Sequence, residues 1–467
     1  MIPFFPHQIS LKSVGIYLGT LAAVSLLFFR YATPVEYTVM GLVWIMVFFG
    51  LTAWTSRKWY HLPRRNFIWL MLALAVGLRV AWVVFSYYFY QAKTGIPFEF
   101  EAADAREYHA DAAWLATTTW HYTWDYLIAS RTSLSDSGYL FYLSTLYRVI
   151  GPGIMSARLV KAVVGAAMCW LLYRLAARTL GETTGRMTGL MAACMPNLII
   201  YCGLHLKETE MLFLTVAFLE RADALLRSQR YTFASVSAPL LLGITLFTFR
   251  TVLGAAALFA FISAVLFSSG EIIGRRKRLA MTGWIVLTLA VLGGGTIANE
   301  TEGYWESRGE NQAVKREQQT QRGNRWAKYA TGTVMAPMMF VLPFPTMVDV
   351  EGQYNQNILH AGNFIRNLTG GFVVLALFNA FFRRKDWRNK VLAGSFMIAY
   401  LTIISMSGFA NSERFLLPGL PLLLLFAADG IAGLNAKSYR FIRIWYWIVP
   451  VMAVAWAFFK VGSRGLL

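Results

Sequence analysis

Charged residues are scarce in this chain of 467 residues. Asp, Glu, Lys and Arg make up 14% of it, whereas a soluble globular protein carries about 25%. Cys169, Cys194 and Cys202 are the only cysteines, and their spacing fits neither a disulfide framework nor a metal site. The sequence also has no Walker motif, no dinucleotide-binding fingerprint and no serine or cysteine nucleophile elbow. These shortages argue against a water-soluble domain, a disulfide-rich protein and an enzyme that binds a nucleotide through one of these motifs.

Hydrophobic sequence, by contrast, is abundant. Hydrophobic residues make up 57% of the chain and aromatic residues 15%, and the mean hydropathy is +0.48. Apolar runs of roughly 17 to 25 residues recur from end to end, which is the length that a helix needs to cross a hydrocarbon core of about 30 Å. The strands of a membrane barrel would instead alternate with a period of two. The sequence therefore predicts an all-α, polytopic membrane protein. Its first run, 11–29, is expected to be a retained helix because no small-residue cleavage site follows it.

The net charge of +19 is concentrated in short clusters of Lys and Arg between the hydrophobic runs. Such clusters favour the cytoplasmic side of a membrane and attract anionic lipid headgroups. We therefore expect membrane lipids, and not nucleic acid, as the partner of this charge. The six clusters lie at 57–65, 174–186, 221–230, 275–278, 383–390 and 437–443.

Placing all six clusters in the cytoplasm requires an even number of crossings between successive clusters. Thirteen helices satisfy this requirement, with the N-terminus in the cytoplasm and the C-terminus outside. They are expected at 11–29, 37–55, 67–90, 156–179, 187–203, 209–226, 233–249, 252–268, 281–298, 368–382, 391–409, 414–434 and 445–461.

The apolar stretch 334–350 is not counted among these helices. It contains three prolines, which break a helix and leave backbone groups unpaired in lipid, so we expect a re-entrant or interfacial segment. Two long regions, 91–155 and 299–367, then lie outside. Outer regions of this size indicate work at the outer surface, because a pure transporter usually has short loops around a midplane site. The predicted order is two additional N-terminal helices (1–66), a core with the first outer loop (67–298), a second outer region (299–367) and the C-terminal helices (368–467).

The first outer region begins with a dense group of carboxylates. Asp104, Glu107, Tyr108 and Asp111 are spaced three, four and seven residues apart, so a helix would bring all four to one face. One interpretation is a solvated acidic face at the membrane surface. The other is a general base that activates an acceptor hydroxyl, in which case Glu107, Tyr108 and His109 would contact the acceptor or the rest of the loop.

Three cations at the outer ends of apolar runs suit a phosphate. Lys207, beside Glu208 and Glu210, interrupts two runs at their outer junction, where it could hold a phosphate at headgroup depth or belong to a polar turn. Arg250 lies between two runs with almost no loop between them. A lipid phosphate would satisfy it by bidentate hydrogen bonding, and snorkelling to the interface is the alternative. Arg414 is a similar cation at an outer end.

Other polar residues are given no catalytic role. Arg79 lies inside its apolar run, and we expect it to face the interior of the bundle in a structural ion pair. His109, His121, His205 and His360 fall in outer segments without the spacing of a helical metal site, so none is assigned as a ligand and the metal requirement stays open. An enzyme that works outside the cell has no nucleotide sugar available, so its donor should be carried by the membrane.

The order of these elements resembles the membrane-embedded glycosyltransferases of the GT-C fold. The similarity is to the protein O-mannosyltransferase-like branch, which includes bacterial aminoarabinose transferases and lipopolysaccharide sugar transferases. It covers residues 67–270 and, more loosely, 391–434. The matching features begin with a span that carries a buried arginine (Arg79) and a first outer loop with an acidic residue and a tyrosine (Asp104, Tyr108). The stretch from SGYLFY to RLAARTLG with Arg158, the helix MTGLMAACMPNLIIY that ends near a proline, and Glu208 follow in the family's order. The last feature is the segment RFLLPGLPLLLLFAA with Arg414, Pro418 and Pro421.

The sequence departs from the family pattern at two points. The spans at 11–29 and 37–55 are additional, because the family usually begins at the helix expected at 67–90. The family's first loop also often reads Asp-Glu, whereas Asp104 is followed by Ala105. Asp111 therefore stays an alternative to Asp104.

The resemblance implies a GT-C-like helical bundle that takes a polyprenyl-phosphate sugar as its donor. The acceptor would be a glycan, a lipid or a protein on the periplasmic face of the cell inner membrane. The phosphate that leaves the sugar is a dianion, which nearby cations would stabilise. No cofactor is implied, although a divalent cation is compatible with the reaction. The implied catalytic carboxylates are Asp104 or Asp111 and Glu208, and the implied donor-phosphate ligands are Lys207, Arg250 and Arg414.

Two other functions stay open. An O-antigen or capsule polymerase or ligase would share the many helices and the large outer loops, but it would use a diphosphate-linked oligosaccharide. A transporter of lipid-linked glycan would carry out no chemistry. Its hallmark would be inverted repeats with paired broken helices, which this sequence does not show.

Overall fold

The computed structural model describes residues 4–130, 135–229, 232–292, 332–407 and 412–462. These residues are almost entirely helical, and no strand occurs among them. Seven of the described helices are long and apolar enough to cross a membrane. The sequence-based prediction of a helical, multi-pass membrane protein is therefore confirmed. The count of thirteen crossings is not confirmed.

The seven membrane-length helices coincide with seven of the expected spans. They are His7–Leu27, Val35–Lys58, Arg64–Thr94, Ile154–Leu180, Tyr354–Arg383, Glu413–Ala432 and Ala436–Gly462. The other expected spans also overlap helices, but these are shorter, less apolar or interrupted. The largest difference concerns 368–382, where the helix begins at Tyr354, inside the region that we expected to lie outside the membrane.

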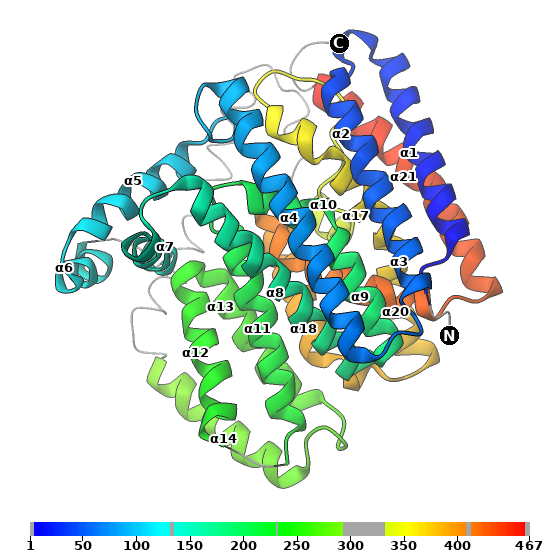
Figure 1. Ribbon diagram of the computed structural model, residues 1–467. Coiled ribbons are helices and arrows are strands. Elements are labelled where there is room, and N and C mark those ends of the chain that lie inside the picture. Colours follow the sequence, from blue (N-terminus) through cyan, green and yellow to red (C-terminus); the bar gives the residue numbers. More distant parts are fainter. Residues whose placement is uncertain (1–3, 131–134, 230–231, 293–331, 408–411, 463–467) are drawn as a thin grey trace. The chain divides into compact units, whose positions relative to one another are not determined.

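The chain divides into two compact units, Met1–Gly50 with Phe259–Leu467 (unit 1) and Leu51–Leu258 (unit 2). Unit 1 contains α1 (His7–Leu27), α2 (Val35–Ile45), α14 (Arg275–Leu292), α16 (Gly332–Met335), α17 (Tyr354–Phe378), α18 (Val391–Ser405), α19 (Glu413–Leu416), α20 (Leu420–Ala432) and α21 (Ala436–Gly462). Within it, α17 packs against α20, α2 and α21, and α1 packs along α21 (Figure 1).

Unit 2 carries most of the expected site residues. Its central helix is α8, which packs against α4, α9 and α11, while α7 packs against α5, α8 and α12 (Figure 1). Its helices are α3 (Thr52–Lys58), α4 (Arg64–Thr94), α5 (Ala103–Thr117), α6 (Trp120–Asp125), α7 (Ser137–Ile150), α8 (Ile154–Leu180), α9 (Glu182–Cys194), α10 (Pro196–Ile200), α11 (Glu208–Arg227) and α12 (Phe233–Phe249), followed by the first part of α13 (Thr251–Phe267).

A proline break in the middle of unit 2 explains the buried Arg79. Pro196 separates α9 from α10, which leaves the last carbonyls of α9 without helical partners. Arg79 is fully buried and donates to the carbonyl oxygens of Ala192 and Ala193, each at 3.2 Å. Its expected burial is confirmed, but its partners are these two carbonyls, the Ala75 carbonyl and the Cys169 sulfur, and not a carboxylate. Gly165 makes room for the guanidinium, because a Cβ there would lie 2.9 Å from Nε of Arg79.

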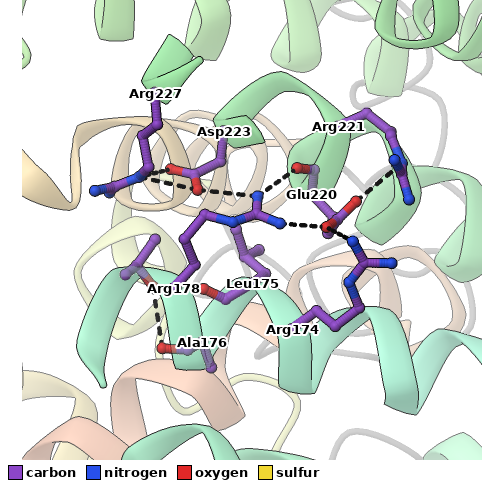
Figure 2. A network of polar contacts seen from close by, with 9 residues as sticks. Arg174, Leu175, Ala176, Arg178, Glu220, Arg221, Asp223 and Arg227 are labelled. Atoms are coloured by element: carbon purple, nitrogen blue, oxygen red, sulfur yellow. Dashed lines mark hydrogen bonds and ion pairs between the residues drawn. The ribbon is translucent and has the colours of Figure 1, made fainter. Parts of the chain in front are cut away.

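Two of the basic clusters meet at one end of α8 and α11. The carboxylates of Glu220 and Asp223, both buried on α11, bind four arginines from two sequence clusters (Figure 2). These are Arg174 and Arg178 of α8 and Arg221 and Arg227 of α11. The shortest distance, 2.5 Å, joins Nη2 of Arg178 to Oε1 of Glu220. The two clusters therefore lie at the same end of unit 2, as the topology prediction requires.

The proline-containing stretch of unit 1 is not a continuous helix. After α16 and a short 3-10 turn, Ala336–Met338 (η6), the chain is irregular from Leu342 to Gln353. The side chain of Asn367 in α17 donates to the carbonyl oxygens of Val341 and Pro343 at 2.6 and 3.1 Å. At membrane depth, irregular backbone is tolerated where it is buried in protein or lines a water-filled cavity, and Asn367 pairs part of this backbone.

Candidate functional site

Four buried cations gather where helix ends meet in unit 2. Nζ of Lys161 in α8 donates to the carbonyl oxygens of Leu204, at 3.1 Å, and Leu206, in the loop before α11. Nζ of Lys207 donates to the carbonyl oxygen of Phe249, at the end of α12, at 2.9 Å. These bonds bring the start of α8, the start of α11 and the end of α12 together. We name this group, Arg158, Lys161, Lys207 and Arg250, the cationic cluster; all four are buried.

Arg158 is the residue of this cluster with the fewest protein partners. Its side chain is fully buried, and none of its three guanidinium nitrogens has a hydrogen-bond partner among the described residues. It forms an ion pair with Glu99 in which Nη2 and Oε2 are 3.9 Å apart, too far for a hydrogen bond. A guanidinium stays protonated in proteins, and burying one without acceptors costs several kcal/mol. The geometry of Arg158 therefore suits a ligand with anionic oxygens.

Lys161 lies one turn after Arg158 on the same face of α8. Its Nζ is 3.5 Å from Oε2 of Glu210 and 5.6 Å from the centre of the Tyr139 ring. The buried hydroxyls of Tyr139 and Tyr142 have no hydrogen-bond partner among the described residues. Burial, with the charge of Glu210 nearby, raises the pKa of Tyr139 well above its usual value, so this phenol stays protonated and can donate to a ligand oxygen.

The expected phosphate ligands Lys207 and Arg250 belong to the cluster, but each has a carboxylate beside it. Lys207 forms an ion pair with Asp136, in the turn before α7. Nη2 of Arg250 lies 3.7 Å from Oε1 of Glu208, which is fully buried in the first turn of α11. The structure thus brings together three residues that the sequence singled out, Lys207, Glu208 and Arg250.

A hydrogen-bonded chain of three side chains leads from the interior of this region to its surface. The Tyr147 hydroxyl lies 2.9 Å from Nε2 of buried His205 and 2.8 Å from Nδ1 of half-buried His109. Nδ1 of His205 is buried and has no partner within the described part of the chain. Burial lowers the pKa of both imidazoles, and Lys161 and Arg158 lower the pKa of His205 further. Both histidines are therefore neutral at pH 7, with one unprotonated ring nitrogen each.

The acidic stretch of the first outer region forms the expected helix, α5. Asp104 and Glu107 are exposed on it and Asp111 is partly buried. Tyr108 is buried, with its ring 5.1 Å from that of Tyr139. Because Tyr108 reaches Tyr139 and Tyr139 lies beside Lys161, α5 is connected to the cationic cluster through aromatic side chains.

The remaining expected ligand, Arg414, lies in the other unit. It is partly buried in α19 of unit 1. Across the residues that the structure describes, no group of three or more His, Cys, Asp or Glu side chains is arranged to hold a metal ion.

Lys161, Tyr147 and Asp136 are among the residues of this region that sequence reasoning did not find. Lys161 carried a usable signal, because Arg158 and Lys161 are two cations three residues apart near the start of an apolar helix, and intramembrane charges tend to mark functional sites. Tyr147 and Asp136 had no such signal, since each gains its role only from a partner far away in the sequence.

Comparisons of the chain with protein-family models, with curated proteins and with solved structures give no match.

Proposed function

We propose that this chain is a membrane glycosyltransferase of the GT-C type. It transfers a sugar from a polyprenyl-phosphate-linked donor to a glycan, lipid or protein acceptor. The reaction takes place at the outer, periplasmic face of the cell inner membrane, at the end of unit 2 opposite the arginine network of Figure 2. The observation that carries the proposal is Arg158, a buried guanidinium in a cluster of cations with no hydrogen-bond acceptor in the part of the chain that the structure describes.

The cationic cluster suits the donor phosphate better than a neutral substrate. Arg158 offers a planar guanidinium that can bind two phosphate oxygens at once, and Lys161 adds a point charge one turn away. When the bond between sugar and phosphate breaks, negative charge builds up on the phosphate, and cations that are already in place stabilise it without reorganisation. The resemblance pointed to Lys207 and Arg250 for this role, and the structure adds Arg158 and Lys161 as candidates.

Two groups are candidates for the base that takes the proton of the acceptor hydroxyl. Asp104 is the sequence-based candidate, and its exposed position on α5 leaves it accessible to a large acceptor. His205 is the alternative. If its Nδ1 accepts the proton, the proton on Nε2 can pass to the Tyr147 oxygen while the Tyr147 proton passes to Nδ1 of His109. The charge then resides on half-buried His109, which can release a proton to water.

The activity is tested with the purified full-length protein in lipid nanodiscs. A panel of polyprenyl-phosphate sugars is supplied with membrane glycans and lipids as acceptors, and the release of polyprenyl phosphate and the formation of a glycosidic bond are measured. Release of polyprenyl phosphate together with formation of a glycosidic bond supports the transferase. Turnover of diphosphate-linked oligosaccharides alone would identify a polymerase or ligase, and movement of lipid-linked glycan across a vesicle membrane without bond formation would identify a transporter.

The role of the cluster is tested by donor affinity. Arg158→Met and Arg250→Ala should each weaken the binding of a polyprenyl phosphate by about 1.5–3 kcal/mol, the scale of a lost hydrogen bond to a charged group. Arg106→Met is the matched control, because Arg106 is exposed on α5. An unchanged affinity in Arg158→Met would remove the cluster from the donor site, and an unchanged affinity in Arg250→Ala would remove that residue alone.

A further inference from the structure

A stripe of polar side chains is buried along α17 of unit 1. Its members lie one to three residues apart in a part of the helix that is buried on all sides, from Asn357 to Val373, and each is at most 5% exposed. They are Asn357, His360, Asn363, Arg366 and Asn367. This helix continues to Arg383 and is long and apolar enough to cross a membrane. Polar residues inside such a helix face the protein interior and tend to mark the path of a substrate or ion.

Most members of the stripe have partners within unit 1. Asn357 donates to Oδ1 of Asp349 at 2.7 Å, and Nε2 of His360 lies 2.8 Å from the Tyr17 hydroxyl. Asn367 binds the irregular backbone around Pro343. These three residues are therefore explained by the fold.

Arg366 is different. It is 1% exposed, and none of its three guanidinium nitrogens has a hydrogen-bond partner among the described residues. Glu413 of α19, also buried, is close enough to act on it electrostatically, but the two side chains do not form an ion pair. Tyr400 of α18 also lies near, and its hydroxyl donates to the carbonyl oxygen of Phe415 at 2.8 Å.

A buried guanidinium has five N–H donors, and those of Arg366 have no acceptor among the described residues, an arrangement that costs free energy. An anion with several oxygens provides those acceptors, and a phosphate fits the planar guanidinium in a bidentate manner. Glu413 repels a bare anion, yet its carboxylate can accept hydrogen bonds from hydroxyl or ammonium groups next to a phosphate. The pair therefore favours a phosphate with donor groups beside it, as in the headgroup of a glycosylated or amino-bearing lipid.

We propose that Arg366 and Glu413 form a second binding site, in unit 1, for a lipid headgroup that carries a phosphate with hydroxyl or ammonium groups beside it. Arg366 binds the phosphate and Glu413 accepts from the neighbouring donors. The site does not depend on the transferase activity, because it is made of residues that the cationic cluster does not use. It provides a place for a second lipid-borne molecule besides the donor.

The first test compares thermal stability without added lipid. Replacing a buried, unpartnered charge by an apolar side chain of similar size stabilises a protein, whereas breaking a structural ion pair destabilises it. Arg366→Met should therefore raise the melting temperature of the detergent-purified protein, while the control Arg440→Met, at an exposed residue of α21, should leave it unchanged. A melting temperature that falls in Arg366→Met would show a structural arginine and overturn the proposal.

The second test measures lipid binding in an Arg158→Met background, so that the cationic cluster does not contribute. Hexosyl farnesyl phosphate and phosphatidylethanolamine should raise the melting temperature, farnesyl phosphate should raise it less, and inorganic phosphate should have the smallest effect because the site lies in a membrane-length helix. Arg366→Met should abolish these shifts, and Glu413→Gln should reduce the difference between hexosyl farnesyl phosphate and farnesyl phosphate. Equal shifts with and without Arg366 would refute the site, even if the transferase proposal holds.

If the background variant does not fold, a photoreactive farnesyl phosphate is crosslinked to the protein with native Arg158. Labelled peptides from α17, α18 or α19 support the second site. Labelling confined to unit 2 contradicts it and leaves the donor site of the proposed transferase standing.

Discussion

The hydroxyl of Tyr147 lies 2.9 Å from Nε2 of His205, and the same oxygen lies 2.8 Å from Nδ1 of His109. One phenol thus joins a buried imidazole to a half-buried one. If protons leave the site along this chain, Tyr147→Phe should reduce turnover by roughly 10²-fold or more, the lower end of the contribution of a positioned proton acceptor, while donor binding persists. Tyr122→Phe, at an exposed position on α6, is the control. Equal turnover in the two variants would show that Tyr147 has only a structural role.

The pH dependence gives a separate test of the same chain. His109 must be neutral to accept a proton, and burial lowers its pKa from the usual value of 6.5. Turnover should therefore be retained down to pH 6.5 and fall only as the pH drops through the lowered pKa. In Tyr147→Phe the remaining activity should lose this acidic limb. An acidic limb above pH 6.5 in the native protein would contradict control by His109.

The choice of base is tested by comparing three variants. Asp104→Asn keeps the size of the side chain but cannot accept a proton, so turnover should fall by about 10²–10⁴-fold if Asp104 is the base, and Asp111→Asn should be milder. If His205 is the base, His205→Gln should show that loss while Asp104→Asn stays active. Asp125→Asn, at an exposed site of α6, serves as the control. Normal activity in both Asp104→Asn and His205→Gln would exclude both candidates.

The arginine network of Figure 2 should contribute to stability and not to catalysis. Glu220→Gln leaves Arg174, Arg178 and Arg221 around a buried site without their shared carboxylate. We expect the free energy of unfolding to drop by up to about 3 kcal/mol, at the low end for a broken buried ion pair, because these arginines are partly exposed. Thermal unfolding in detergent measures the change, with Glu271→Gln at an exposed position as the control. An unchanged melting temperature would mean that the network adds no net stability.

The orientation in the membrane is tested by thiol labelling in intact cells. Single cysteines at Ser135 and Gln318 should react with a membrane-impermeant reagent, in a background without the three native cysteines, and a cysteine at Lys58 should react only after lysis. Gln318 lies outside the described residues. Protection of Ser135→Cys or Gln318→Cys in intact cells would overturn the assignment of 91–155 or 299–367 to the outer side.

The helices of this protein could be predicted from the sequence because lipid imposes a local rule. A helix satisfies its own backbone hydrogen bonds, so a run of about 20 apolar residues is sufficient to specify a crossing. For that reason the predicted runs 67–90 and 156–179 agree with α4 and α8. The number of crossings could not be predicted in the same way. Helices such as α12 and α13 are shorter than a membrane-length helix, and their composition alone does not determine whether they cross the membrane.

The candidate site could be predicted only in part, for a physical reason. Lys207, Glu208 and Arg250 were found because a charge next to an apolar run is costly wherever the chain folds. The bonds that define the site join residues far apart in the sequence, as Tyr147 and His205 show. The sequence by itself determined a helical membrane protein with cations and carboxylates at the ends of its helices. The tertiary structure alone decided which of those charges gained partners and which, like Arg158 and Arg366, were buried without hydrogen-bond acceptors among the described residues. The reason is that pairing depends on how the helices pack against one another and not on what each helix contains.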